Sequence, residues 1–390
     1  MHTRGHPAAI ASVSRAIASE NPPHALLLIG PRGSGKTTLA LDLAAGLLCN
    51  AADPAARPCR ACAACRKVEH GNHPDVHRIM PEGAGDQIRL AQVTGLVSEL
   101  ALLPMEGRRR LAIISAAQRM NPDAQNALLK TLEEPVGAAT IVLCADDQAA
   151  ILPTVVSRAA RLRLGPVAIP VVEALIVEQG IADAPRARIA ALAAGGLPGL
   201  AMTIAAHPES TLVADRLLRQ LLDLLGADRR TRLGAVPALV ADGAALDAAL
   251  RSEPAPDEGA AADAPTGRAA GDGRAAVKGG AAAAGSAPSA PAASRKPQPA
   301  ERRRAAVRVI DAWRAVGRDL AVVDRGGRVQ VRRMDLLEDL EAVAPRVDRV
   351  ALLAFLDRLD GMGAAIEAYA NPELVLDHLV LAWPHLGRAA

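Results

Sequence analysis

One segment constrains the fold more than any other. Residues Gly30 to Thr37 read GPRGSGKT and directly follow the apolar run Ala25–Ile29. The pattern predicts a buried strand, a phosphate-binding loop and a helix that begins at Lys36 with its positive end toward the phosphates. Gly33 and Gly35 allow the tight turn in which successive N–H groups point at a polyphosphate. We therefore expect nucleotide binding, although the loop alone does not say whether the nucleotide is hydrolysed.

The expected ligand is ATP with Mg²⁺. In loops of this kind the lysine, here Lys36, reaches the β and γ phosphates, and the hydroxyl of Thr37 reaches the metal. The residues that we expect to bind the nucleotide are Gly30, Gly33, Ser34, Gly35, Lys36, Thr37 and Thr38.

Short apolar runs alternate with helical patterns as far as Leu164, which is typical of an α/β domain with a mostly parallel sheet. One helix is well specified, because Asn121 is a good N-cap, Pro122 suits the first helical position and Pro135 ends the pattern. The expected strands are Ala25–Ile29, Val76–Met80, Leu111–Ser115, Ile141–Ala145 and Ala160–Leu164.

The length of 390 residues allows two or three domains. The patterns predict the nucleotide-binding domain over residues 1–165, a small helical unit over 166–207 and a larger helical domain over 208–390. Residues from about 252 to about 300 are rich in Ala, Gly, Pro and Ser, which predicts a disordered insertion.

Composition narrows the function further. Only 1% of the residues are aromatic, so we expect cores of Ala, Leu and Val and no aromatic platform for stacking bases. A net charge of +3 gives no global nucleic-acid footprint. The sequence has neither a signal-peptide core nor an apolar run of transmembrane length, so we expect a cytoplasmic protein without membrane contact.

Four cysteines, Cys49, Cys59, Cys62 and Cys65, follow the predicted loop helix with the spacing C-x9-C-x2-C-x2-C. Four thiolates in a short segment complete a tetrahedral Zn²⁺ site, and a fully protein-ligated site is structural. We expect such a zinc module over about residues 49–72. Four reduced thiols without metal are the alternative, and disulfides are a weaker one without an exported context.

Acidic residues that ATPases need are missing where we expect them. In an ATPase of this architecture the strand beside the loop strand ends in acids that position Mg²⁺ and polarise the attacking water. We identify that strand with Leu111–Ile114, which ends in Ser115-Ala116-Ala117. Losing general-base assistance costs about 10²–10⁴ in rate, so we expect slow hydrolysis at best. In the alternative, Ile141–Ala145 is the neighbouring strand, and it runs into Asp146-Asp147.

A further segment carries a family resemblance. Residues 121–135 read NPDAQNALLKTLEEP, which closely resembles a signature of the bacterial sliding-clamp loaders of the DNA polymerase III holoenzyme, AAA+ proteins. His24–Leu27, His73–Asp75 and Leu152–Arg158 are also similar to this family, and the four cysteines lie where these loaders carry their zinc. The strong match extends from Ala25 to about Arg163.

The resemblance implies an AAA+ subunit made of a nucleotide domain, a helical lid and a helical collar that assembles a pentameric ring. The ring opens a sliding clamp and places it on primed DNA, and its other members are the gamma/tau and delta subunits. Ser157-Arg158 matches the family's Ser-Arg-Cys motif, with Ala159 in place of Cys. The resemblance therefore implies that Arg158 acts in trans as an arginine finger at a neighbour's ATP. The alternative is an exposed charge at a strand edge.

Two more departures from the family favour a weak or silent ATPase. Asp146 lies where the family commonly has a polar sensor of the γ-phosphate, and Pro198 stands where motor subunits carry a sensor arginine. We therefore expect a loader subunit that binds ATP weakly or not at all, hydrolyses it poorly and supports the gamma/tau motor. The alternatives are the motor itself, a stand-alone P-loop enzyme and a zinc-dependent nucleic-acid-binding protein.

Overall fold

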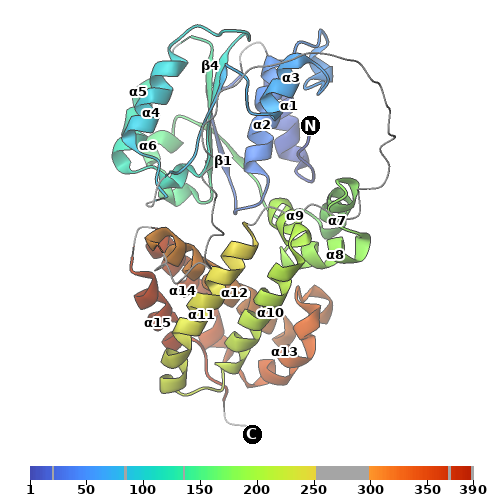
Figure 1. Ribbon diagram of the computed structural model, residues 1–390, viewed down its shortest axis with the longest axis vertical. Coiled ribbons are helices and arrows are strands. Elements are labelled where there is room, and N and C mark those ends of the chain that lie inside the picture. Colours follow the sequence, from blue (N-terminus) through green and yellow to red (C-terminus); the bar gives the residue numbers. More distant parts are fainter. Residues whose placement is uncertain (20–21, 83–85, 135–136, 252–297, 368–369, 388–390) are drawn as a thin grey trace, which may run out of the picture.

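The computed structural model describes residues 1–19, 22–82, 86–134, 137–251, 298–367 and 370–387. Most of the expected insertion at about 252–300 lies outside these residues, as does Pro135, the expected stop of the helix after Asn121. The helix that follows the expected insertion begins at Pro299. The described chain forms an upper α/β part and a lower helical part, joined by three short helices (Figure 1).

Five parallel strands form one sheet in the order β2-β3-β4-β1-β5. All five predicted strands are present, with ends that differ by one or two residues. Their bounds are β1 Ala25–Ile29, β2 Val76–Ile79, β3 Arg110–Ile114, β4 Ala139–Ala145 and β5 Ala160–Arg163. β1 lies inside the sheet between β4 and β5, which explains why all five of its residues are buried.

The order of the strands corrects one expectation. β1 pairs with β4 and β5, so the strand beside the loop strand is β4 and not Leu111–Ile114, which lies one strand further away as β3. A crossover helix lets a parallel sheet skip positions, so sequence order does not reveal neighbours. Ile29 is in register with Ala145, and Asp146 therefore follows β4 next to the start of the loop.

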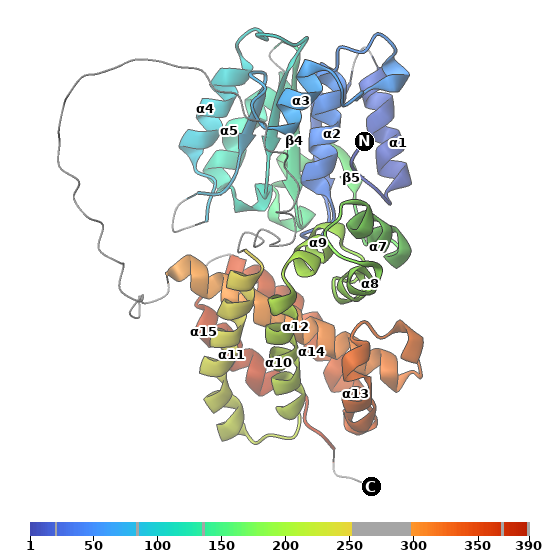
Figure 2. The same cartoon turned by 45° about the vertical axis from the view of Figure 1, so that its right-hand side comes forward.

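Helices cover both faces of the sheet (Figure 1, Figure 2). One face packs against α1 (Pro7–Ala18), α2 (Lys36–Leu48) and α3 (Ala63–Glu69), and the other against α4 (Leu90–Leu100), α5 (Pro122–Glu133) and α6 (Pro153–Val156). Side chains of β1 alternate between the two cores: Leu26 and Leu28 belong to the first, and Leu27 and Ile29 to the second.

Beyond β5 the described chain is helical. The helices α7 (Ile169–Glu178), α8 (Ala184–Ala193) and α9 (Pro198–Ala206) share a small apolar core of their own. The larger core that follows is built by α10 (Pro208–Asp223), α11 (Arg229–Ala249), α12 (Pro299–Asp324), α13 (Leu337–Val343), α14 (Arg349–Glu367) and α15 (Pro372–Ala382). Among the described residues, no helix has the length and apolar character needed to cross a membrane.

Aromatic rings have a place in this larger core that the composition did not predict. Trp313, Phe355 and Trp383 are buried together, with ring centroids 4.8–6.4 Å apart. The expectation of cores without stacked rings is therefore wrong here, because the few aromatic residues of the chain are concentrated in one place. Edge-to-face contacts of this kind contribute about 0.5–1.5 kcal/mol per pair beyond their burial.

Candidate nucleotide-binding and zinc sites

The predicted phosphate loop lies between β1 and α2 with the backbone that its glycines require. Gly33 and Gly35 have φ angles of 82° and 93°, in the left-handed region that favours glycine. Gly30 is also constrained, because a Cβ there would lie 2.0 Å from the carbonyl oxygen of Leu164. Gly35 is the N-cap of α2, so the positive end of this helix faces the inside of the loop.

Lys36 is engaged by its own chain. Its ammonium group donates to the carbonyl oxygens of Gly30 and Pro31, at 2.5 and 3.0 Å, and to Oδ1 of Asp146 at 2.8 Å. The lysine side chain is 9% exposed. An ammonium group has three donors, and all three have a partner here. A phosphate would have to replace at least one of these acceptors.

Asp146 is the acid that sequence analysis placed at the γ-phosphate sensor, and it lies against Lys36. Its other carboxylate oxygen accepts a 2.8 Å hydrogen bond from Nε2 of Gln118. Gln118 was missed by sequence reasoning, because it lies 28 positions away and follows a different strand. With its side chain 33% exposed, Asp146 faces both Lys36 and solvent, where it would repel an incoming polyphosphate.

The first turn of α9 rests on the phosphate loop. The N–H of Gly199 donates to the carbonyl oxygen of Gly33 at 2.8 Å, and a Cβ on Gly33 would lie 2.9 Å from the backbone nitrogen of Leu200. Pro198, where motor subunits carry the sensor arginine, is buried at the start of this helix. The start of α9 therefore contacts the loop through backbone and apolar atoms at these residues.

The remaining predicted loop residues differ in exposure. Thr37 is half-buried and Thr38 is exposed, whereas Ser34 is buried. The hydroxyl of Ser34 is buried without a hydrogen-bond partner among the described residues, and the Ser34 carbonyl oxygen lies 3.0 Å from Nε2 of His6. His6 was not anticipated, since it lies in the N-terminal segment and no motif marks it.

The end of β3 carries no acid. Ser115 follows the strand, and its hydroxyl is likewise buried without a partner among the described residues. Asp147, the second acid after β4, accepts a hydrogen bond from the N–H of Ala149 and caps a short turn. The carboxylate at the edge of the sheet that reaches the loop is thus that of Asp146.

Arg158 lies between α6 and the edge strand β5. In the sequence it is far from the chain's own phosphate loop. Its guanidinium contacts Oε1 of Glu133 at 2.7 Å and the carbonyl oxygen of Thr154 at 3.0 Å. The side chain is 35% exposed. Glu133 belongs to the NPDAQNALLKTLEEP segment, so the structure brings two of the quoted motifs into contact, which their sequence positions did not predict.

The four cysteines converge. The Sγ atoms of Cys49, Cys59, Cys62 and Cys65 all lie within 4.8 Å of one another, between the end of α2 and the first turns of α3. Backbone N–H groups point at the sulfurs: Cys59 donates to Sγ of Cys49, and Cys65 donates to Sγ of Cys62, both at 3.4 Å. Such N–H···S contacts stabilise thiolates, which are the metal-binding form.

The electrostatics of this cluster are uneven, because burial raises the pKa of the Cys65 thiol to about 12 whereas two other thiols have a lowered pKa. Burial opposes ionisation of Cys62, but N–H groups, that of Asn50 first, bring its pKa down to about 6. The N–H of Ala61 similarly holds the pKa of Cys59 below its usual value. Four sulfur donors with this spacing match the tetrahedral thiolate set of structural Zn²⁺, so the cluster could hold such an ion. His73 is buried, and its Nδ1 accepts from the N–H of Asp75.

Asp75, from the quoted segment His73–Asp75, stabilises a loop through its side chain. Its buried carboxylate accepts three backbone hydrogen bonds, of 2.6–2.9 Å, from Met105, Glu106 and Gly107. Burial opposes ionisation, yet these three donors together lower the pKa of Asp75. The carboxylate thereby fixes the loop that leads into β3.

A five-stranded parallel sheet in this order, with a phosphate loop after β1 and a helical unit resting on that loop, defines a P-loop domain of the AAA+ type. Residues 5–168 match the family "DNA polymerase III, delta subunit". Through this domain the chain is similar to the delta' subunits of DNA polymerase III.

Individual relatives show the same similarity in sequence. The delta' subunit of Bacillus subtilis is 37% identical over 158 residues, which are 40% of this chain and 47% of the relative. The delta' subunit of Pseudomonas aeruginosa is 42% identical over 135 residues, 35% of this chain and 41% of the relative. The tau subunit of Salmonella typhimurium is 32% identical over 168 residues, 42% of this chain and 26% of the relative. The chain thus spans less than half the length of these relatives.

Proposed function

We propose that this protein is the delta' subunit of the DNA polymerase III clamp loader, which helps to load a sliding clamp onto primed DNA in the cytoplasm. The family match of residues 5–168 supports the assignment. In the proposal, residues 1–165 form the AAA+ domain, 166–207 the lid and 208–390 the collar. The partners would be the gamma/tau and delta subunits of a pentameric ring, with the clamp and DNA contacted through the complex.

We expect weak ATP binding and poor hydrolysis at this chain's own loop, and the observation that supports this is the set of hydrogen bonds made by Lys36. All three donors of its ammonium group are used by Gly30, Pro31 and Asp146. A phosphate must displace these partners and then lie beside the charge of Asp146, which weakens binding. Ser115 supplies no acid after β3, and Asp146, the acid after the neighbouring strand β4, is held by Lys36 and Gln118. Bound ATP would therefore lack free carboxylates that position Mg²⁺ and water. The chain would therefore bind ATP weakly and hydrolyse it poorly.

We further propose that Arg158 acts in trans on the ATP of a neighbouring subunit. Support comes from its partial exposure and from its position in the segment that resembles the family's Ser-Arg-Cys motif. A surface ion pair such as Arg158–Glu133 contributes about 0–1 kcal/mol, so it is readily exchanged for a phosphate contact. An arginine finger contributes about 10³–10⁵ in rate, far more than the pair that it gives up.

ATP turnover by a loader reconstituted with the cognate gamma/tau and delta subunits tests both parts. We expect negligible turnover by the isolated chain and strong, DNA-stimulated turnover by the complex. Arg158→Ala should lower the stimulated turnover by at least about 10²-fold, because its charge stabilises the transition state. The matched control is Arg161→Ala, which removes an exposed arginine from neighbouring β5.

Assembly of each complex is checked by gel filtration, so that a lost subunit is not mistaken for a lost finger. Rapid turnover by the isolated chain would contradict the silent site. Equal effects of Arg158→Ala and Arg161→Ala in assembled complexes would contradict the finger.

The gamma/tau motor remains the second candidate, because the chain is also 32% identical to tau subunits over 168 residues. A motor would turn over ATP at its own loop. In that case Lys36→Ala in this chain would lower turnover by the complex, whereas the delta' proposal expects that substitution to leave turnover unchanged.

A further inference from the structure

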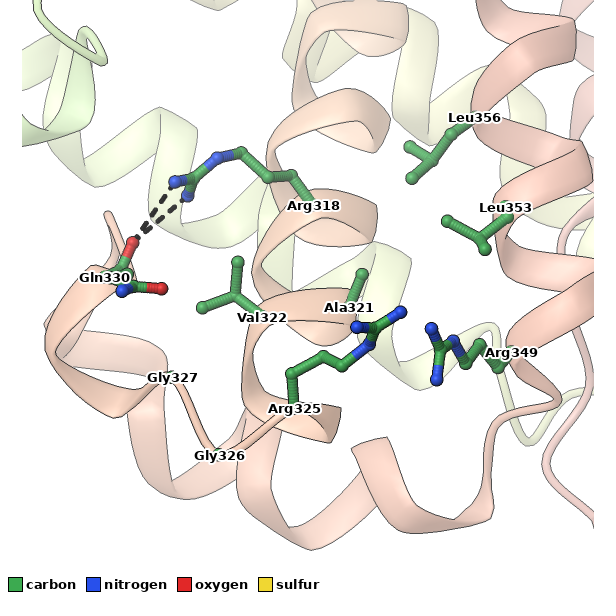
Figure 3. A pocket seen from close by; sticks show the side chains of 10 residues that line it. All are labelled: Arg318, Ala321, Val322, Arg325, Gly326, Gly327, Gln330, Arg349, Leu353 and Leu356. Atoms are coloured by element: carbon green, nitrogen blue, oxygen red, sulfur yellow. Dashed lines mark hydrogen bonds between the residues drawn. The ribbon is translucent and has the colours of Figure 1, made fainter.

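A cavity of about 630 Å³ opens between α12 and α14, in the helical part of the molecule and apart from the phosphate loop (Figure 3). Its size is typical of sites that take a ligand or several side chains of a partner. It is lined from α12 and the turn after it by Arg318, Ala321, Val322, Arg325, Gly326, Gly327 and Gln330, and from α14 by Arg349, Leu353 and Leu356.

Three arginines, Arg318, Arg325 and Arg349, and no acidic residue line this cavity. Arg318 is already neutralised, because it bonds Oδ1 of Asp319 at 2.7 Å and the carbonyl oxygen of Gln330 at 3.3 Å. Figure 3 shows the side chains of Arg325 and Arg349 extending toward one another from the two helices. Within the described part of the chain, neither is in an ion pair, and both are exposed. Two like charges facing one opening favour an anion between them.

The rest of the cavity wall is apolar. Ala321 and Val322 belong to α12, and Leu353 and Leu356 to α14. Leu353 remains 45% exposed, and Val350, one turn before it on α14, is 77% exposed. Such side chains gain by contact with apolar groups of a ligand, which inorganic anions do not offer. The ligand must therefore combine negative charge with apolar surface.

We propose that this cavity binds an acidic segment of a partner protein, with an Asp or Glu carboxylate between Arg325 and Arg349 and an adjacent apolar side chain against Leu353. A guanidinium bonds a carboxylate bidentately, so two of them fix its position as well as its charge. Single-stranded nucleic acid fits less well, because no aromatic residue lines the cavity to stack a base. The inference uses only the helical part and does not depend on the proposed loader function.

The experiment is a selection from a random-peptide display library on the full-length protein, followed by fluorescence anisotropy with a labelled peptide from the enriched pool. We expect enrichment of Asp and Glu next to apolar residues. Binding of that peptide should weaken about tenfold or more in the double variant Arg325→Ala/Arg349→Ala, or when its acidic residue is changed to the amide. Leu353→Ser should also weaken it.

The matched control is Arg229→Ala/Arg230→Ala, which removes the same charge from exposed residues at the start of α11, outside the cavity. It should bind the peptide like wild type. Circular dichroism melting establishes that both double variants are folded. The proposal would be overturned if no selected peptide depends on Arg325 and Arg349, or if the control weakens peptide binding equally. It would also be overturned if the protein binds a single-stranded oligonucleotide and the Arg325→Ala/Arg349→Ala variant loses that binding instead.

Discussion

Replacing Asp146 by asparagine removes the negative charge beside Lys36 while keeping the size of the side chain. At the observed N–O distance of 2.8 Å the pair is in contact, with Lys36 buried and Asp146 one third exposed. Charge-assisted hydrogen bonds contribute about 1.5–3 kcal/mol, and the exposure of Asp146 lowers the estimate to about 1–3 kcal/mol. Asp146→Asn should therefore tighten ATP binding by about 5–150-fold.

Isothermal titration calorimetry with ATP and Mg²⁺ measures this change in the isolated chain. Asp147→Asn is the matched control, since it removes an equal charge from the adjacent residue that caps a turn and does not bond Lys36. Adding Lys36→Ala to Asp146→Asn should abolish the gain, because the freed ammonium is what binds the phosphate. Turnover should stay negligible even in the tighter variant, since it has lost the Asp146 carboxylate after β4 and Ser115 supplies none after β3.

The reasoning fails if Asp146→Asn leaves the dissociation constant unchanged, which would mean that the ion pair does not compete with nucleotide. An equal gain in ATP affinity from Asp147→Asn would show that the net charge near the loop, and not the Lys36–Asp146 pair, determines the affinity. Fast hydrolysis by Asp146→Asn would show that catalytic groups exist elsewhere.

Three further predictions concern the zinc site, the arginine and the loop before β3. Cys59→Ser should lose the bound zinc and lower the melting temperature, whereas Cys144→Ala, at the cysteine buried in β4, should keep the metal; zinc analysis by mass spectrometry decides. Glu133→Gln should change turnover of the reconstituted loader at most about fivefold, because exposed pairs are weak; a loss as large as that of Arg158→Ala would show that Arg158 acts through Glu133. Asp75→Asn should cost about 2–4 kcal/mol in urea unfolding at neutral pH. Since the folded-state pKa of Asp75 is lowered, its contribution is present above the unfolded pKa of about 3.9 and is lost as pH falls through the folded value, so wild type and variant should converge in acid and a constant difference would contradict this role.

Local patterns predicted much of the domain that carries the nucleotide site. The strands, the loop and the helix N-cap at Asn121 follow from alternation, glycine positions and capping, each of which is written in a few consecutive residues. The cysteine cluster follows from spacing for the same reason. The order of the strands in the sheet does not follow from local patterns, because β4 pairs with β1 through a crossover whose path no short segment encodes.

Contacts between distant segments account for what sequence reasoning missed. Gln118, which follows β3, reaches Asp146 at the end of the neighbouring strand β4, and Glu133 at the end of α5 reaches Arg158 after α6. Both are polar residues in helical or turn segments, where an exposed, solvated position is the ordinary expectation. Only the folded chain distinguishes a side chain with a functional partner from one without.

The loop and the lid impose two separate requirements on nucleotide entry. Lys36 must leave Asp146, which is an electrostatic cost that Asp146→Asn removes. The first turn of α9 also rests on the loop, because the carbonyl oxygen of Gly33 accepts a hydrogen bond from the N–H of Gly199, and we expect this turn to shift when nucleotide enters. The residues just before this turn are also closely packed. The N–H of Val167 donates to the carbonyl oxygen of Gly196, and a Cβ on Gly195 would lie 2.5 Å from the guanidinium of Arg332. Nucleotide would therefore have to move a lid that the larger helical part supports, so removing Asp146 alone should relieve the charge and leave the mechanical cost in place.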